Sequence, residues 1–152
     1  MSQQNKAIVR RYIEEAWIQG KIDILDEILT PDVSVNTPPF GKYTGIENAK
    51  NDLKISQAGY TDMQVTIEGI IAEGDIVAVW FTFTGNHTGE VLGIPPSGKK
   101  LTLSALGWFR LTNGKIAEAF FNQDNLGFLL ELGLIPPMEK LFAQLKNTIH
   151  IE

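Results

Sequence analysis

The sequence predicts an α+β fold with a largely antiparallel sheet. Helical patterns fill the first part of the chain, and runs of strand length follow one another in the second half, a grouping typical of this class. The last two strand runs are joined by Asn113-Gly114, a dipeptide that favours a tight hairpin turn. The 152 residues contain no internal repeat, no low-complexity segment and no linker, so we expect one domain over residues 1–152.

The N-terminal part is predicted to be helical because apolar residues recur there at helical spacing. This stripe runs over residues 4–19 and ends at Gly20, and a shorter helix over residues 22–29 is stopped by Pro31. An extended segment at residues 33–35, a turn at 38–41 and a third helix over 46–58 complete this part.

The sheet is predicted from runs rich in β-branched and aromatic residues. They cover residues 63–71, 76–84, 101–111 and 116–123, with turn-forming segments at 73–75, 93–98 and 113–114 between them. Two further helices, over residues 126–132 and 138–146, are predicted at the C-terminal end, the first closed by Gly133.

Composition excludes several classes of function. The net charge is -5 with acids and bases interspersed, which argues against nucleic acid or an anionic membrane as partner, because both need a concentrated basic face. Cysteine is absent and histidine occurs twice, so disulfides and zinc–thiolate sites are excluded and a metal centre is not expected. No signal peptide or membrane-spanning run is visible, which predicts a cytoplasmic protein.

The run over residues 76–84 is apolar on both faces. Val77, Val79, Phe81 and Phe83 share one parity, and Ile76, Ala78 and Trp80 share the other. An antiparallel sheet with one solvated face alternates more cleanly. We therefore expect helices to cover one face and a second copy of the chain to cover the other, in a homodimer.

The main indication of function is the last strand and the acid that comes directly after it. In a strand, alternate residues share a face, which predicts one row of side chains ending at a strand-to-helix junction. The row consists of Ile116, Glu118, Phe120, Asn122 and Asp124. An aromatic ring, an amide and a carboxylate in order suit a pocket wall better than a plain core.

Asp124 has two interpretations. As a helix N-cap, its carboxylate accepts backbone N–H bonds and stays strongly acidic. Projecting into an apolar pocket, it has a raised pKa and becomes a usable base near neutral pH.

His87 and the aromatic residues also have either a structural or a functional interpretation. His87 follows the parity of Phe81 and Phe83, so it either reaches the rim of the same cavity or is a hydrogen-bonded, idle residue at a strand end. Among the aromatic side chains, Trp17 and Trp108 are the expected pocket pair, because a buried indole N–H needs a partner.

Four groups of residues occur in an order that is fairly specific as a set. They are residues 12–29 with Pro31-Asp32; residues 85–90 with 93–98; Phe109-Arg110 with 113–116; and Glu118-x-Phe120-x-x-x-Asp124 with Leu126-Gly127 and Leu132-Gly133. Through these landmarks the chain resembles the SnoaL-like polyketide cyclase family. This family is part of the superfamily that includes ketosteroid isomerase, scytalone dehydratase and nuclear transport factor two.

The resemblance implies a cone-shaped, strongly curved sheet that wraps a deep pocket closed by helices. It also implies that an aspartate at the position of Asp124 is the acid/base of an intramolecular aldol ring closure, without metal or cofactor. The chain departs from the family at Phe120, where tryptophan is usual, and this changes the pocket wall and with it the expected substrate.

These observations support two functions from different classes. The first is a cofactor-independent cyclase or isomerase of a hydrophobic carbonyl compound, with Asp124 as base. Hydrogen-bond donors to its carbonyl oxygens would be His87, Asn122 and Trp108, and the apolar walls would be Tyr12, Trp17, Phe40, Leu53 and Phe120. The second is a non-catalytic binder of a small apolar ligand, with Asp124 as a cap; a related epoxide hydrolase or dehydratase also fits.

Overall fold

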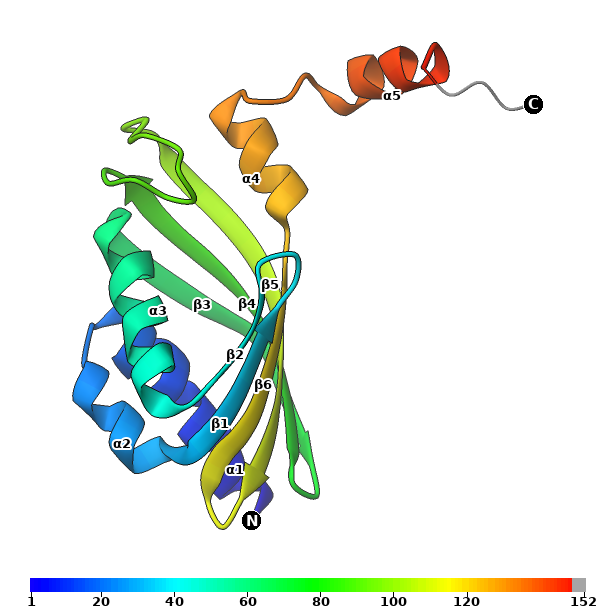
Figure 1. The fold of residues 1–152 in the computed structure, drawn as a ribbon. Helices are drawn as coiled ribbons and strands as arrows, with labels where there is room; N and C mark the ends of the chain where they lie inside the picture. The colour runs from blue at the N-terminus through cyan, green and yellow to red at the C-terminus, as the bar shows by residue number, and fades with distance from the viewer. Residues whose placement is uncertain (149–152) are drawn as a thin grey trace.

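Helices from the first 58 residues pack on one side of a strongly curved, six-stranded sheet in the computed structural model, which describes residues 1–148 (Figure 1). The N-terminal helical layer consists of α1 (Ser2–Arg10), the π-helix η1 (Arg11–Ile18), the 3-10 helix η2 (Ile22–Ile24) and α2 (Leu25–Ile28). The strands are β1 (Leu29–Thr37), β2 (Gly41–Thr44), β3 (Tyr60–Glu73), β4 (Ile76–His87), β5 (Lys100–Thr112) and β6 (Lys115–Gln123). α3 (Ile46–Ala58) lies between β2 and β3, and α4 (Asn125–Leu132) and α5 (Met138–Lys146) come after β6.

The sheet has the strand order β2-β1-β6-β5-β4-β3 and does not close into a barrel. The long strands β3 to β6 form an antiparallel meander, and β1 pairs with β6 in parallel. The predicted α+β class with a largely antiparallel, curved sheet is thus confirmed. The short strand β2, which pairs with β1, was not predicted, because Lys42, Tyr43 and Thr44 come after a turn and form too short a run to show a period.

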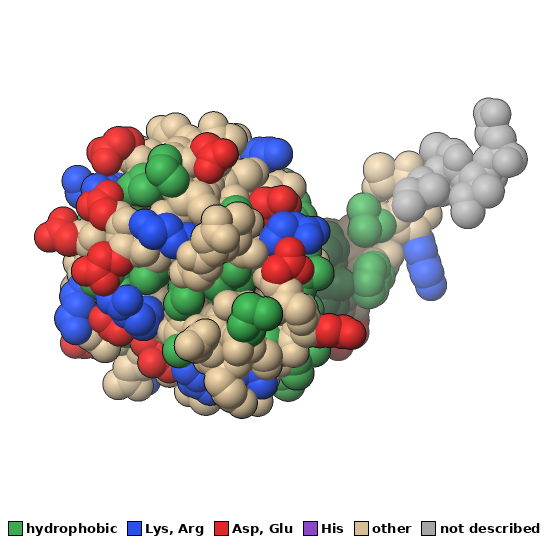
Figure 2. Space-filling model, turned by 90° about the horizontal axis from the view of Figure 1, so that it is seen from below, with side chains coloured by type: hydrophobic (Ala, Val, Ile, Leu, Met, Phe, Trp, Pro, Cys, Tyr) green, Lys and Arg blue, Asp and Glu red, His purple; other side chains and the backbone are tan. Residues whose placement is uncertain are grey.

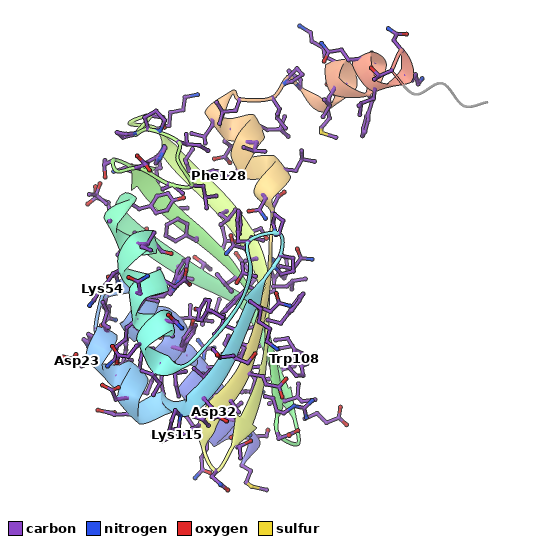
Figure 3. All side chains as sticks on the ribbon, in the orientation of Figure 1. Asp23, Asp32, Lys54, Trp108, Lys115 and Phe128 are labelled. Atoms are coloured by element: carbon purple, nitrogen blue, oxygen red, sulfur yellow. The ribbon has the colours of Figure 1, made fainter. Side chains whose placement is uncertain are left out.

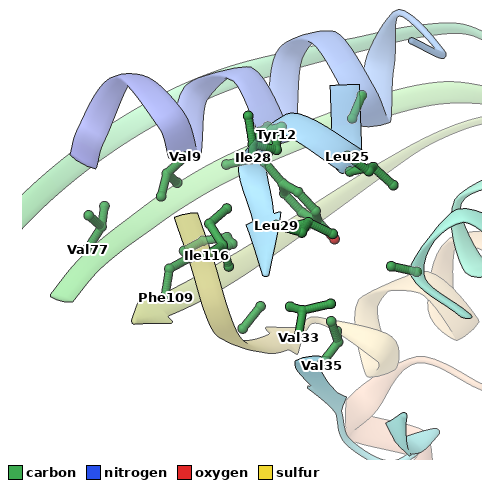
Figure 4. Packing of buried hydrophobic residues seen from close by; sticks show 14 of the residues in the cluster. Val9, Tyr12, Leu25, Ile28, Leu29, Val33, Val35, Val77, Phe109 and Ile116 are labelled. Atoms are coloured by element: carbon green, nitrogen blue, oxygen red, sulfur yellow. The ribbon is translucent and has the colours of Figure 1, made fainter. Parts of the chain in front are cut away.

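The core lies between the concave face of the sheet and the N-terminal helices (Figure 4). Val9 and Tyr12 from the first helical stretch pack on Phe109 of β5 and Ile116 of β6. Tyr12 meets Phe109 edge to face, with 5.7 Å between ring centroids. This interdigitation of large side chains holds the helices on the sheet.

A bulge in β6 overturns the predicted row of side chains. Arg110 pairs with Glu118 and the next residue of β5, Leu111, pairs with Ile116, so Ala117 is an extra residue on β6. An extra residue reverses the parity of the strand residues beyond it. Ile116 is therefore buried in the core, whereas Glu118, Phe120 and Asn122 are exposed on the opposite face of the sheet.

The two faces of β4 are both apolar, as predicted. Val77, Val79, Phe81 and Phe83 are buried under the helices, whereas Trp80 on the other face is 51% exposed. That outer face also carries Trp108, which projects away from the helices (Figure 3). Figure 2 shows the molecule from below, with acidic and basic side chains interspersed over that view. No helix among residues 1–148 is long and apolar enough to cross a membrane.

Candidate active site

A cavity of about 380 Å³ opens between the N-terminal helical layer, α3 and the concave face of the sheet. Its walls are mostly apolar and aromatic. They are formed by Tyr12, Ile13 and Trp17 of η1, by Ile55 and Ser56 of α3, by Phe81 and Phe83 of β4, and by Leu103, Ala105 and Phe121 of the sheet floor. A few polar groups, including Tyr43, Asp52, Tyr60 and Gln123, face the same space. Such a combination of apolar walls and few polar groups is typical of small-molecule sites.

Some of the predicted binding residues lie at this cavity. Tyr12, Trp17 and Phe40 are part of its lining. Phe40, in the turn after β1, is 50% exposed and stands at the opening. Leu53 is buried in the core on α3 but is not part of the lining, because the helix turns it toward the interior beside Ala49.

Other predicted binding residues lie on the outer face of the sheet. Trp108 and Phe120 are cross-strand partners there and border a shallow depression with Lys42 and Glu118. Asn122 pairs with Leu106 on the same face. The β6 bulge explains this placement of Phe120 and Asn122, and Trp108 shares their face through its pairing with Phe120. The alternate β6 residues, Phe121 and Gln123, are the ones that line the cavity.

Asp124 lies at the junction of β6 and α4 and is solvent-exposed. Its Oδ1 accepts a hydrogen bond of 2.8 Å from the backbone N–H of Gly127, as an N-cap does. Within residues 1–148, its second carboxylate oxygen, Oδ2, accepts no hydrogen bond. Asp124 comes directly after Gln123 of the cavity wall. Asp124 itself is not part of the cavity lining, and the structure shows it as an exposed capping residue with one free oxygen.

His87 is fully buried at the end of β4 but is not part of the cavity lining. Its ring lies near Tyr60 and Phe128, at centroid distances of 6.0 and 6.5 Å. The backbone N–H of Ser97 donates to Nδ1 at 3.2 Å, so Nδ1 acts as acceptor and the ring proton is assigned to Nε2. Nε2 is buried without a hydrogen-bond partner among the described residues. The contacts with Ser97 tie the 88–99 loop to β4.

Sequence reasoning missed an acidic residue that lines the cavity, Asp52. It is half-buried on α3, and the Tyr43 hydroxyl of β2 donates to its Oδ2 at 3.1 Å. Burial raises the pKa of Asp52, and the hydrogen bond from Tyr43 partly opposes this. A signal was present in the sequence, because Asp52 lies one helical turn after the buried Ala49 and so shares its side of α3.

The cavity tyrosines are protonated hydrogen-bond donors. Burial raises the pKa of Tyr12 and Tyr43 well above the ordinary value, and the Asp52 charge raises both further. Burial also raises the pKa of Tyr60 to about 12. No group of three or more His, Cys, Asp or Glu residues within the described part of the chain is placed to hold a metal ion.

The sequence matches a known family over most of its length. Residues 7–132 fit the family description SnoaL-like polyketide cyclase. Among curated proteins, the chain is similar to the nogalonic acid methyl ester cyclase of Streptomyces nogalater, with 27% identity over 120 residues that cover 78% of this chain and 90% of the relative.

Solved structures share the fold. A structure from Jannaschia sp. CCS1 that bears the same family description has a TM-score of 0.82 at 28% identity and covers 89% of this chain and 95% of its own. TsrD from Streptomyces laurentii has a TM-score of 0.78 at 25% identity, with 88% and 97% covered. An LEH-like epoxide hydrolase of M. tuberculosis reaches 0.69 at 18% identity, with 86% and 90% covered, and shows the fold alone.

Proposed function

Since the chain belongs to the SnoaL-like polyketide cyclase family, we propose that it is a cofactor-independent cyclase or isomerase of an apolar, polyketide-type carbonyl compound. The single observation that carries the proposal is the cavity of about 380 Å³, which combines aromatic walls with a small number of polar groups. The relative at 27% identity is named as a cyclase of nogalonic acid methyl ester, which supports this substrate class.

The proposed chemistry is proton transfer and then carbon–carbon bond formation. Asp124 takes a proton from the carbon next to a carbonyl group, and the electron pair of that C–H bond moves into an enolate. The enolate carbon attacks a second carbonyl carbon of the same molecule, and the resulting alkoxide is protonated by the acid. Asp124 follows Gln123 of the cavity wall in the sequence, and its Oδ2 accepts no hydrogen bond from a described residue, which supports a role as proton acceptor.

A second candidate function is a binder of a small apolar ligand without turnover. It is favoured by the exposure of Asp124 and by its hydrogen bond to Gly127, since a capping residue needs no chemical role. The same cavity serves both functions, so only a reaction assay separates them.

Ring closure of nogalonic acid methyl ester, monitored by mass spectrometry and NMR of the product, tests the proposal. We expect turnover by the wild-type protein and a loss of about 10²–10⁴-fold in Asp124→Asn, the usual contribution of a general acid/base group. Asp32→Asn is the matched control and should react like the wild type. Asp32 is an exposed acid on β1 without a side-chain hydrogen bond or ion pair within the described residues.

Equal turnover by Asp124→Asn and the wild type would remove Asp124 from the mechanism. Saturable binding of the ester with no conversion by the wild type would support the binder instead. Addition of water to an epoxide substrate, with no ring closure, would point to the hydrolase chemistry of the more distant structural relative.

A further inference from the structure

A polar cluster lies on one wall of the mostly apolar cavity. It consists of Asp52 on α3, Tyr43 on β2 and Tyr12 on η1, all three of which line the cavity. These elements are far apart in the sequence, and the fold brings one residue from each to the same wall. The proposed function uses none of them.

The carboxylate of Asp52 is held on one side only. Oδ2 accepts the Tyr43 hydroxyl at 3.1 Å, and within residues 1–148 Oδ1 has no hydrogen-bond partner. Asp52 also forms no ion pair with a described lysine, arginine or histidine. A buried carboxyl group needs compensating hydrogen bonds, and this one has a single donor from the protein.

The Tyr12 hydroxyl is a fixed donor without a partner. The ring is packed against Phe109 at 5.7 Å and stacked on Phe121 at 6.1 Å, which holds its direction. Among the described residues, none hydrogen-bonds to its hydroxyl. The charge of Asp52 contributes to the raised pKa of both Tyr12 and Tyr43.

We propose that Asp52 is a second acid/base group of the cavity, which hydrogen-bonds through its free oxygen to a ligand oxygen that also accepts from Tyr12. The cavity would then select apolar molecules with an oxygen substituent that reaches this wall. Tyr43 is a positioning residue, because it holds Asp52 and does not need to touch the ligand. The raised pKa of Asp52 increases its protonated fraction near neutral pH.

The role in the reaction rests on the proposed function. When the enolate carbon attacks the second carbonyl, that C=O bond becomes a C–O⁻ bond. In place of the protonated Asp124, Asp52 then supplies the proton: its O–H bond breaks and a new O–H bond forms on the alkoxide, which leaves Asp52 ionised. Asp124, protonated in the first step, releases its proton to solvent, and Asp52 regains one, so the reaction as a whole is an isomerisation.

Two naphthalene probes test the cluster without knowledge of the natural substrate. The carbonyl of 2-acetylnaphthalene only accepts hydrogen bonds, so it should bind best when Asp52 is protonated, and its binding should weaken as the pH rises through the pKa of Asp52. The hydroxyl of 2-naphthol donates to an ionised Asp52, so its binding should strengthen over the same pH range. This phenol stays neutral below about pH 9.

The other titratable groups at the cavity do not produce opposite pH dependences for the two probes. Tyr12, Tyr43 and Tyr60 have raised pKa values and stay protonated from about pH 4 to about pH 8. The basic side chain of Lys42 on β2 also lines the cavity. Opposite pH dependences for the two probes would therefore report Asp52.

Fluorescence titration of the full chain gives the dissociation constants. We expect the dissociation constant of each probe to change by about tenfold or more between about pH 4 and about pH 8. A change of this size corresponds to the free energy of one hydrogen bond to a charged group. Asp52→Asn should abolish both pH dependences, and Asp32→Asn should retain them. Tyr43→Phe should move the midpoint to higher pH, because it removes the donor that lowers the pKa of Asp52.

The outcomes separate the two proposals. Failure of the wild type to bind either probe, or pH dependences that persist in Asp52→Asn, would overturn the role of Asp52. A different outcome is that the two probes show opposite pH dependences that Asp52→Asn abolishes, while the protein closes no ring. That result would support the role of Asp52 and would count against the proposed function alone.

Discussion

At the residue scale, the position of Asp124 depends on a missing side chain three residues later. A Cβ built on Gly127 would overlap the carboxylate of Asp124. Gly127 therefore lets this carboxylate fold back over the first turn of α4 and accept the backbone N–H. The sequence shows the acid and the glycine at capping distance, but it does not show how closely they approach.

Gly127→Ala should displace the Asp124 carboxylate while leaving the carboxylate in the protein. Loss of the cap costs about 1 kcal/mol, whereas alanine in a helix gains about the same over glycine, so the free energy of unfolding should change by less than about 1 kcal/mol. A misplaced catalytic group costs up to about 100-fold in turnover. Urea denaturation and the ring-closure assay together measure both effects, and a Gly127→Ala protein with unchanged turnover would speak against Asp124 as base.

At the element scale, the sequence predicts the long elements well and their irregularities poorly. The ranges of α3, β4, β5, β6 and α5 agree with the prediction to within a few residues, because alternation or helical spacing runs their full length. The bulge at Ala117 has no local signal and depends on how β6 pairs with β5. One extra residue moved Phe120 and Asn122 to the outer face and Phe121 and Gln123 to the cavity, so two of the errors at the candidate site have one cause.

The π-helix η1 is a second irregularity that sequence pattern does not reveal. Its winding presents Tyr12, Ile13 and Trp17 to the cavity. At its C-terminal end, the carbonyls of Ala16 and Trp17 accept from Gln57 Nε2 of α3, at 3.2 and 3.1 Å. This side chain connects the two helical walls of the cavity.

Gln57→Ala should lower the free energy of unfolding by about 1–3 kcal/mol, because two half-buried carbonyls lose their donor. Asn51→Ala is the matched control on α3, since Asn51 is exposed and makes no side-chain hydrogen bond within the described residues; it should change the value by no more than about 0.5 kcal/mol. Urea denaturation measures both. Equal stabilities for the two variants would show that Gln57 does not hold η1.

At the scale of the whole molecule, the outer face of the sheet carries an exposed apolar patch. Trp80, Leu106 and Phe120 are 51%, 58% and 38% exposed on adjacent strands. Trp80 pairs with Leu106, and Phe120 pairs with Trp108 next to them, so these side chains form one continuous patch. We propose that a second copy of the chain covers this patch, because a sheet face can meet its own copy across a two-fold axis.

One chain has a mass of 16.9 kDa, and light scattering at micromolar concentration should then give twice this mass. Leu106→Arg should shift the protein toward the monomer, because it places a charge at the centre of the patch. Thr112→Arg, at the exposed end of the same strand β5, should stay dimeric. A wild-type protein with the mass of one chain would contradict this assembly.

We propose that carboxylate chemistry on a carbonyl compound takes place at the cavity. Hydrogen–deuterium exchange next to the carbonyl of 2-tetralone, monitored by proton NMR in D₂O, measures the first step of that chemistry directly. Ile55→Trp fills the cavity from its exposed rim on α3, and Lys54→Trp, on the solvent side of the same helix, is the control (Figure 3). The account predicts faster exchange with the wild type and Lys54→Trp than with buffer, and a loss of about 10²–10⁴-fold with Ile55→Trp and with Asp124→Asn. Exchange that is equally fast with all four proteins, or no faster than in buffer, would contradict it.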